Sequence, residues 1–194
     1  MHSFLRLGRA FALGLAVFAP TLSARDFVFD TVHSQIGFSI SHLGFSMSQG
    51  RFKGLEGGFS FNAKHWDRST CDIRIDINSL DLGDAAWQKK LLGKDWFAAD
   101  TFPQARFECI EMQQIDAQHG TLRGRLHLRG VVREVELAVT LNRIGMHKFA
   151  LQYAAGFSAT TTFRRSDFGM KKYLGDIGDE VQLRIDIEAF RRKD

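Results

Sequence analysis

The sequence predicts an all-β fold: one antiparallel barrel of about eight strands, with a single short helix that covers one end as a lid. Three observations support this prediction. Most segments alternate apolar and polar residues with a period of two, which is typical of strands with one buried face. The alternate face is rich in charged residues, so the outside meets water, unlike the apolar outer face of a membrane barrel. Only one segment has helical spacing, and closing the strands into a barrel removes unpaired sheet edges.

The first 24 residues have the pattern of a secretory signal peptide. Arg6 and Arg9 form a basic start, and Ala10–Ala19 is an apolar run followed by small residues up to Ala24. The apolar run is well short of the ~20 residues that span a membrane, so a membrane anchor is the less favoured alternative. Cleavage after Ala24 leaves one domain, residues 25–194, and lowers the formal net charge from +4 to +2 because two arginines are lost.

Composition argues against a nucleic-acid-binding protein and against stable membrane insertion. The basic residues are scattered along the mature domain, apart from a short basic tail, whereas a nucleic-acid groove needs a basic stripe with aromatic residues between. No segment after the first 24 residues is long and apolar enough to cross a membrane.

Residues 33–61 read as a long, bent hairpin with one aromatic face. In its first strand, one phase is apolar except for a single histidine: Ile36, Phe38, Ile40 and His42. A turn-rich segment follows, and the chain returns through Phe52 to Phe59 and Phe61, which share a phase. We expect the remaining strands to close a wall around this face.

The rest of the chain alternates between strand patterns, with one interruption. The interruption is residues 85–92, which form a good helix with Asp84 as N-cap and Gly93 as the end. The expected strands cover residues 27–30, 71–78, 106–112, 122–128, 135–141, 149–163 and 181–187.

Cys71 and Cys109 are the only cysteines, and each lies in phase with core residues of its strand. An even number of cysteines in an exported protein permits a disulfide. Two buried thiols are an equal alternative at this point.

Several motifs occur in an order that resembles the YceI-like family. They extend from about residue 27 to residue 189 and are, in order, His33-Ser34-Gln35-Ile36-Gly37-Phe38, His42-Leu43-Gly44, Gly50-Arg51-Phe52, Pro103 with Phe107, Gly124-Arg125-Leu126 with Arg129-Gly130, Arg165-Ser166-Asp167-Phe168-Gly169-Met170, and Gly178-Asp179-Glu180-Val181. One segment before the helix, Leu80-Asp81-Leu82-Gly83-Asp84, departs from the Thr-rich pattern of the family.

The resemblance implies a lipocalin-like barrel that is exported to the periplasm of Gram-negative bacteria. Its interior would hold a long isoprenoid lipid, of the polyprenyl phosphate or quinone type. The resemblance also implies that the chain forms a homodimer. No cofactor is expected beyond such a bound lipid.

Strand phase and the resemblance together select the candidate ligand-binding residues. The expected wall is Phe38, Phe52, Phe59, Phe61, Phe107, Phe157 and Phe163. The expected lid is Trp87, Trp96 and Phe97. A barrel of this size either fills itself with side chains or holds one small ligand. Small inward residues such as Gly124, Ala159 and Ala189 fit both a cavity and a solid core.

The polar candidates are few. His42 is a candidate for contact with a ligand head group, or for holding a neighbouring loop. His33 lies nine residues from His42, which is near 30 Å along a strand, so one metal ion shared by the two is not expected. Arg51 and Arg165 are candidates to pair with a phosphate, or with Asp167 or Asp179.

No catalytic motif is recognised, so a binding protein is the first hypothesis. It would hold an isoprenoid lipid for transport, storage or a stress response. A second hypothesis is an enzyme that acts on a small amphiphile, with His42 as acid or base. A third is a quinone-linked partner of a membrane b-type cytochrome.

Overall fold

The computed structural model describes residues 25–192, and the expected signal peptide lies outside them. Eleven strands are present in this range. They are β1 Arg25–Phe29, β2 Gln35–His42, β3 Ser46–Phe52, β4 Leu55–Phe61, β5 Thr70–Asp76, β6 Leu80–Asp81, β7 Gln104–Gln114, β8 His119–Leu128, β9 Val131–Met146, β10 Tyr153–Arg164 and β11 Ile177–Arg191. The helices are α1 Ala85–Leu92 and three short 3-10 turns, η1 Trp66–Arg68, η2 Ile77–Ser79 and η3 Arg165–Phe168.

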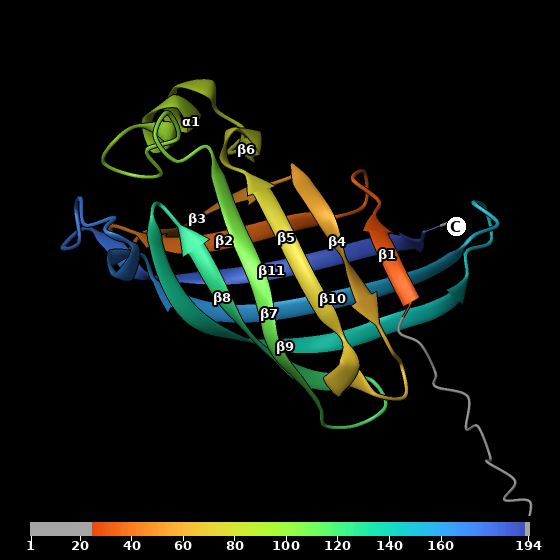
Figure 1. Cartoon of the computed structure of the whole chain (residues 1–194). Coiled ribbons are helices and arrows are strands. Elements are labelled where there is room, and N and C mark those ends of the chain that lie inside the picture. Colours follow the sequence, from red (N-terminus) through yellow and green to blue (C-terminus); the bar gives the residue numbers. More distant parts are fainter. Residues whose placement is uncertain (1–24, 193–194) are drawn as a thin grey trace, which may run out of the picture.

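Eight strands close into an antiparallel barrel, as the sequence predicts (Figure 1). The ring runs β1-β4-β5-β7-β8-β9-β10-β11 and returns to β1. β2, β3 and β6 extend the sheet beyond this ring. β11 belongs both to the ring and to this extension, because one of its edges pairs with β2 along its first part and with β1 near its end.

The stretch expected to be one bent hairpin divides into two parts. β2 and β3 form a hairpin in which Ile36 lies opposite Phe52. After Phe52 the chain turns at Lys53–Gly54, and β4 pairs with β1 and β5 instead. The aromatic residues of this stretch are therefore divided between the β2–β3 hairpin and β4, which lie in different parts of the sheet.

The one long helix forms where the sequence predicts it, with the expected N-cap. The Asp84 carboxylate accepts a hydrogen bond from the Trp87 backbone N–H at 2.7 Å, which satisfies one of the unpaired donors of the first turn. Leu91 and Leu92 pack against a buried cluster that contains Phe52, Leu80 and Phe168. Figure 1 places α1 beside β6, above the start of β7, as a cover over one end of the barrel.

The strand expected over residues 149–163 begins later than its alternating pattern suggests. β10 starts at Tyr153, and residues 147–152 form the turn after β9. Phe149 and Leu151 share the strand phase but are 93% and 76% exposed. A backbone hydrogen bond from Leu151 N–H to the His147 carbonyl closes this turn, so local turn geometry overrides the alternation.

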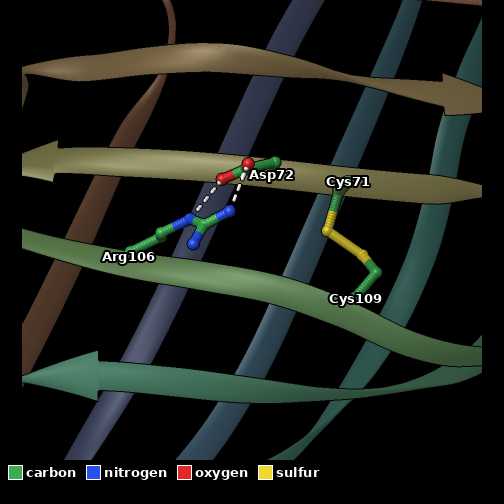
Figure 2. The surroundings of a disulfide bond; sticks show 4 residues. All are labelled: Cys71, Asp72, Arg106 and Cys109. Atoms are coloured by element: carbon green, nitrogen blue, oxygen red, sulfur yellow. Dashed lines mark hydrogen bonds and ion pairs between the residues drawn. A yellow bond between two sulfur atoms is a disulfide. The ribbon is translucent and has the colours of Figure 1, made fainter.

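Cys71 and Cys109 form a disulfide between β5 and β7, with their Cα atoms 5.1 Å apart. Figure 2 shows the bridge joining the two neighbouring strands beside the Asp72–Arg106 pair. Arg106 donates two hydrogen bonds to the Asp72 carboxylate, at 2.8 and 2.6 Å. Both cysteines pack against the core, whereas Asp72 and Arg106 are exposed, so the strands are apolar inside and charged outside.

Candidate functional site

Two apolar cavities lie end to end inside the barrel. The outer cavity, about 200 Å³, lies under α1. The inner cavity, about 160 Å³, lies deeper between the strands of the ring. They share part of their walls, namely Ile36, Ile75, Leu126, Phe163 and Leu183. Together they fall within the lower part of the roughly 300–1,000 Å³ range of ligand pockets.

The outer cavity brings together most of the side chains that the sequence analysis selects. They come from β2, β3, α1, the segment after α1, and β10, and they are Phe38, His42, Phe52, Trp87, Trp96, Phe97 and Phe163. The Phe52 ring contacts the rings of Phe38 and Phe97, with centroids 5.9 and 5.4 Å apart. The aromatic wall and the helical cover are therefore one continuous surface.

The inner cavity is lined by Phe59, Phe107, Phe157 and Phe163 of the expected wall. Its other walls are mostly aliphatic, with Ser and Thr as the polar residues and no charged side chain among the described residues that line it. The disulfide between Cys71 and Cys109 also lines this cavity. Such a surface offers burial to a hydrocarbon chain and almost no hydrogen bonds.

Phe61 lies outside both cavities, in the solid part of the barrel. Its ring packs against Trp66 and Phe157, with centroids 5.4 and 4.9 Å apart. Trp66, carried by η1, is 1% exposed and closes this end of the barrel. The interior thus combines the two alternatives that the sequence leaves open, a solid core at one end and cavities towards the other.

The small inward residues divide in the same way. A Cβ atom on Gly124 would lie 2.2 Å from the Phe107 ring, so glycine there makes room for an aromatic side chain. Ala189 is fully buried in the solid core. Ala159 lines the inner cavity.

Arg165 is a buried cation in the wall of the outer cavity. It is 2% exposed, and its guanidinium donates to the carbonyl oxygens of Gly178, Met170 and Ile177 at 2.8, 2.6 and 2.9 Å. It also lies over the Trp96 ring, 5.1 Å from the centroid. Burial lowers the pKa of Arg165, and the negative charge of Asp179 opposes this shift. Arg165 therefore joins η3, β11 and the lid.

Polar contacts anchor the lid to the loop that follows β10. Arg129 donates to the carbonyl oxygen of Lys94 at 2.6 Å and to that of Gly169 at 2.9 Å. Lys172 forms an ion pair with Asp95. The segment after α1 is thus held from two sides, which fixes the cover of the outer cavity.

The other polar candidates have separate positions. His42 is exposed at the end of β2, where it lines the outer cavity. Arg51 binds the Asp81 carboxylate on the outside, at 3.0 and 2.9 Å, so it lies neither in the two apolar cavities nor beside Asp167 or Asp179.

Asp30, His33 and Glu188 lie together, with one donor atom from each within 4.8 Å of the others. They lie away from both apolar cavities. The Asp30 carboxylate closes a turn there by accepting hydrogen bonds from the backbone N–H groups of Val32 and His33. Burial raises the pKa of Asp30, but the hydrogen bond from the His33 ring and those from the backbone outweigh burial and hold it below its usual value. The same contact raises the pKa of His33.

Sequence reasoning missed the aliphatic half of the cavity wall. Four aliphatic residues line both cavities and form part of the wall that the cavities share: Ile36, Ile75, Leu126 and Leu183. Their inward strand phase carries the signal, since Ile75, Leu126 and Leu183 each lie between polar residues and Ile36 lies between Gln35 and Gly37. Sequence reasoning also missed that Arg165 is a buried side chain that joins neighbouring segments. No local sequence pattern predicts that its guanidinium donates to three carbonyl oxygens in β11 and in the loop before it.

The fold and the cavities define a class: a small barrel with a charged exterior and a ligand-sized apolar interior under a helical lid. The chain belongs to the YceI-like family, whose domain model matches residues 27–189. A UPF0312 protein of Shewanella putrefaciens is 32% identical over 93% of this chain and 95% of its own. Another from Photorhabdus laumondii is 35% identical over 83% of each chain.

Solved structures have the same lipocalin-like architecture. Burkholderia cenocepacia BcnA matches with a TM-score of 0.74 and 25% identity, over 82% of this chain and 98% of BcnA. A polyisoprenoid-binding domain from Saccharophagus degradans matches with a TM-score of 0.63 and 16% identity, over 87% of this chain and 99% of that domain. None of the helices within residues 25–192 has the length and apolar character of a membrane-spanning segment.

Proposed function

We propose that this protein binds a long isoprenoid-type lipid inside the barrel after export to the periplasm, and carries or stores it there. The observation that carries the proposal is the pair of apolar cavities that share one wall. A flexible hydrocarbon chain fits two narrow spaces in sequence better than a compact, rigid ligand does. The similarity in fold to a polyisoprenoid-binding domain supports the same ligand class.

The energetics fit such a ligand. Burial of apolar surface contributes roughly 25 cal/mol per Å², so a long tail binds without polar contacts. The few polar side chains that line the outer cavity are His42, Ser48, Lys90, Arg165 and Tyr173. We therefore place the tail in the inner cavity and the head group in the outer cavity, towards α1.

The test compares two leucine substitutions on neighbouring strands. Ala159→Leu fills part of the inner cavity, and Ala138→Leu adds the same atoms on the exposed face of the adjacent β9 strand. Binding of an octaprenyl ligand and of a geranyl ligand to the mature protein would be measured by native mass spectrometry and equilibrium titration. Circular dichroism would check that both variants fold.

We expect Ala159→Leu to weaken octaprenyl binding by about tenfold, while geranyl binding and the Ala138→Leu variant change little. This difference arises because only the longer tail reaches the inner cavity. A wild-type protein that binds neither ligand would contradict the proposal, as would equal octaprenyl affinity in both variants. Comparing polyprenyl phosphate with a quinone of equal tail length would then identify the preferred head group.

A further inference from the structure

The opening of the outer cavity is bordered by exposed apolar side chains from two segments. These side chains lie at the tip of the β2–β3 hairpin and in the loop before β11, and we call them the mouth patch. They are Leu43, Phe45, Met47, Tyr173 and Leu174, which are 49%, 90%, 48%, 48% and 41% exposed, in that order. The two segments lie side by side, because Leu43 N–H donates to the Asp176 carbonyl at 2.8 Å and Ile177 pairs with His42. Exposed apolar groups gathered in this way mark an interaction surface.

The mouth patch is continuous with the interior of the barrel. Tyr173 belongs to the patch and also lines the outer cavity. Ile177 and His42, which lie next to the patch, line the same cavity. Lys90 of α1 lines the same cavity and is exposed, so the cavity reaches solvent between α1 and this loop. An apolar molecule leaving the cavity would pass directly over the mouth patch.

Lysines flank the mouth patch. Lys90 and Lys172 each lie over the Tyr173 ring, with Nζ at 5.7 and 5.4 Å from the centroid. Lys89 and Lys171 are their exposed neighbours. Among residues 25–192, Lys89, Lys90 and Lys171 have no ion-pair partner. Apolar side chains surrounded by lysines match the boundary of an anionic bilayer, where the apolar groups enter the interface and the cations meet lipid head groups.

We propose that the mouth patch docks on the surface of a bilayer that contains anionic phospholipid, so that the outer cavity opens towards the membrane. The bound lipid then enters or leaves without crossing water. The identity of that lipid rests on the proposed function, whereas docking itself rests only on the surface. A bilayer fits better than a protein partner because the patch surrounds the opening of an apolar cavity and the free cations beside it are all lysines.

The chain offers a matched control at the opposite end of the barrel. Phe149 is 93% exposed in the β9–β10 turn, close to the 90% of Phe45, but it does not line either apolar cavity. Phe45→Ser and Phe149→Ser remove the same side chain from equally exposed sites, so neither is expected to destabilise the fold. Lys90→Gln with Lys171→Gln tests the contribution of charge.

Flotation of the mature protein with vesicles is the test. The vesicles would be phosphatidylcholine alone, or phosphatidylcholine mixed with phosphatidylglycerol. We expect the wild type and Phe149→Ser to float with the mixed vesicles, and Phe45→Ser to bind them about tenfold less, because a fully buried Phe is worth roughly a factor of ten or more. The double lysine variant should lose the preference for phosphatidylglycerol, as should the wild type in high salt.

Equal vesicle binding by Phe45→Ser and the wild type would overturn the proposal, and so would loss of binding in Phe149→Ser. Sedimentation that shows Phe45→Ser converting a dimer to a monomer would also overturn it, because a second copy of the chain would then cover the patch. Ligand binding without vesicles separates the two ideas. A protein that binds the octaprenyl or geranyl ligand but no vesicle defeats docking alone, and a protein that binds vesicles but neither ligand defeats the proposed function alone.

Discussion

The two ends of this barrel use the same kinds of residue for different purposes. At the closed end, Trp66 and Phe61 fill the interior and leave almost no surface exposed. At the lidded end, Phe38, Phe52 and Phe97 surround an open space instead. The difference teaches that an inward aromatic residue does not by itself indicate a core or a binding site. What lies opposite it across the barrel decides between the two.

The largest effect is expected at the closed end. Trp66→Ala removes a side chain that is 1% exposed, which should lower the free energy of unfolding by about 3–5 kcal/mol. Octaprenyl affinity of the folded variant should change little, because Trp66 lines neither apolar cavity. Urea denaturation and ligand titration measure the two quantities. A large loss of affinity with little loss of stability would reverse the roles assigned to the two ends.

The disulfide is expected to have a slightly smaller effect on stability. Its cysteines are 38 residues apart, and a loop of that size predicts about 3–4 kcal/mol of stabilisation through restriction of the unfolded chain. Denaturation of the Cys71→Ala, Cys109→Ala double variant would measure it. Mass determination of the unreduced wild type provides the control, since two free thiols there would remove the basis of this prediction.

The lid should show the opposite balance between stability and binding. Trp87 is half-buried and lines the outer cavity, so Trp87→Ala should cost only about 1 kcal/mol of stability. It should nevertheless weaken lipid binding several-fold, because the ligand loses part of its cover. Thermal unfolding with and without the octaprenyl ligand reports both effects. An unchanged ligand-induced shift would show that α1 does not cover the bound lipid.

The smallest effect is a pH dependence at the lidded end. Burial raises the pKa of Asp179, but hydrogen bonds from the Ser166 hydroxyl and N–H, at 2.7 and 2.9 Å, and the charge of Arg165 hold it below its usual value. A carboxyl group whose pKa is lower in the folded state adds stability above its unfolded pKa of about 4, and this stability is lost as the pH falls through the folded pKa.

Asp179→Asn should therefore be less stable than the wild type at neutral pH, and the two should converge in acid. Denaturation midpoints across a pH series would measure this difference. Asp30→Asn provides a control away from both apolar cavities, where a lowered carboxyl pKa depends on a different partner, His33. It should share the pH trend but leave lipid binding unchanged. A gap between Asp179→Asn and the wild type that widens in acid would contradict the assigned direction of the pKa shift.

The sequence predicts the barrel and its lid because their determinants are local. Period-two alternation marks the strands, and Asp84 with Gly93 brackets the helix as the structure has it. The boundary after β9 is missed because Phe149 and Leu151 keep the strand phase while the backbone turns. The strand phase also predicts that Phe61 and Phe59 lie on one face. It does not predict that Trp66 fills the space beside Phe61, because that contact depends on where η1 folds back.

Photo-crosslinking tests the central claim most directly. That claim is that an isoprenoid tail occupies the inner cavity while its head group lies in the outer cavity, under α1. An octaprenyl ligand with a diazirine near its head group and a second with a diazirine near its tail end would be bound to the mature protein and irradiated. We predict that the head-group probe labels peptides of α1 and β2, and that the tail probe labels β7 and β10, beside Phe107 and Phe157. Labelling confined to the outer charged faces, or none in the presence of saturating ligand, would contradict the claim.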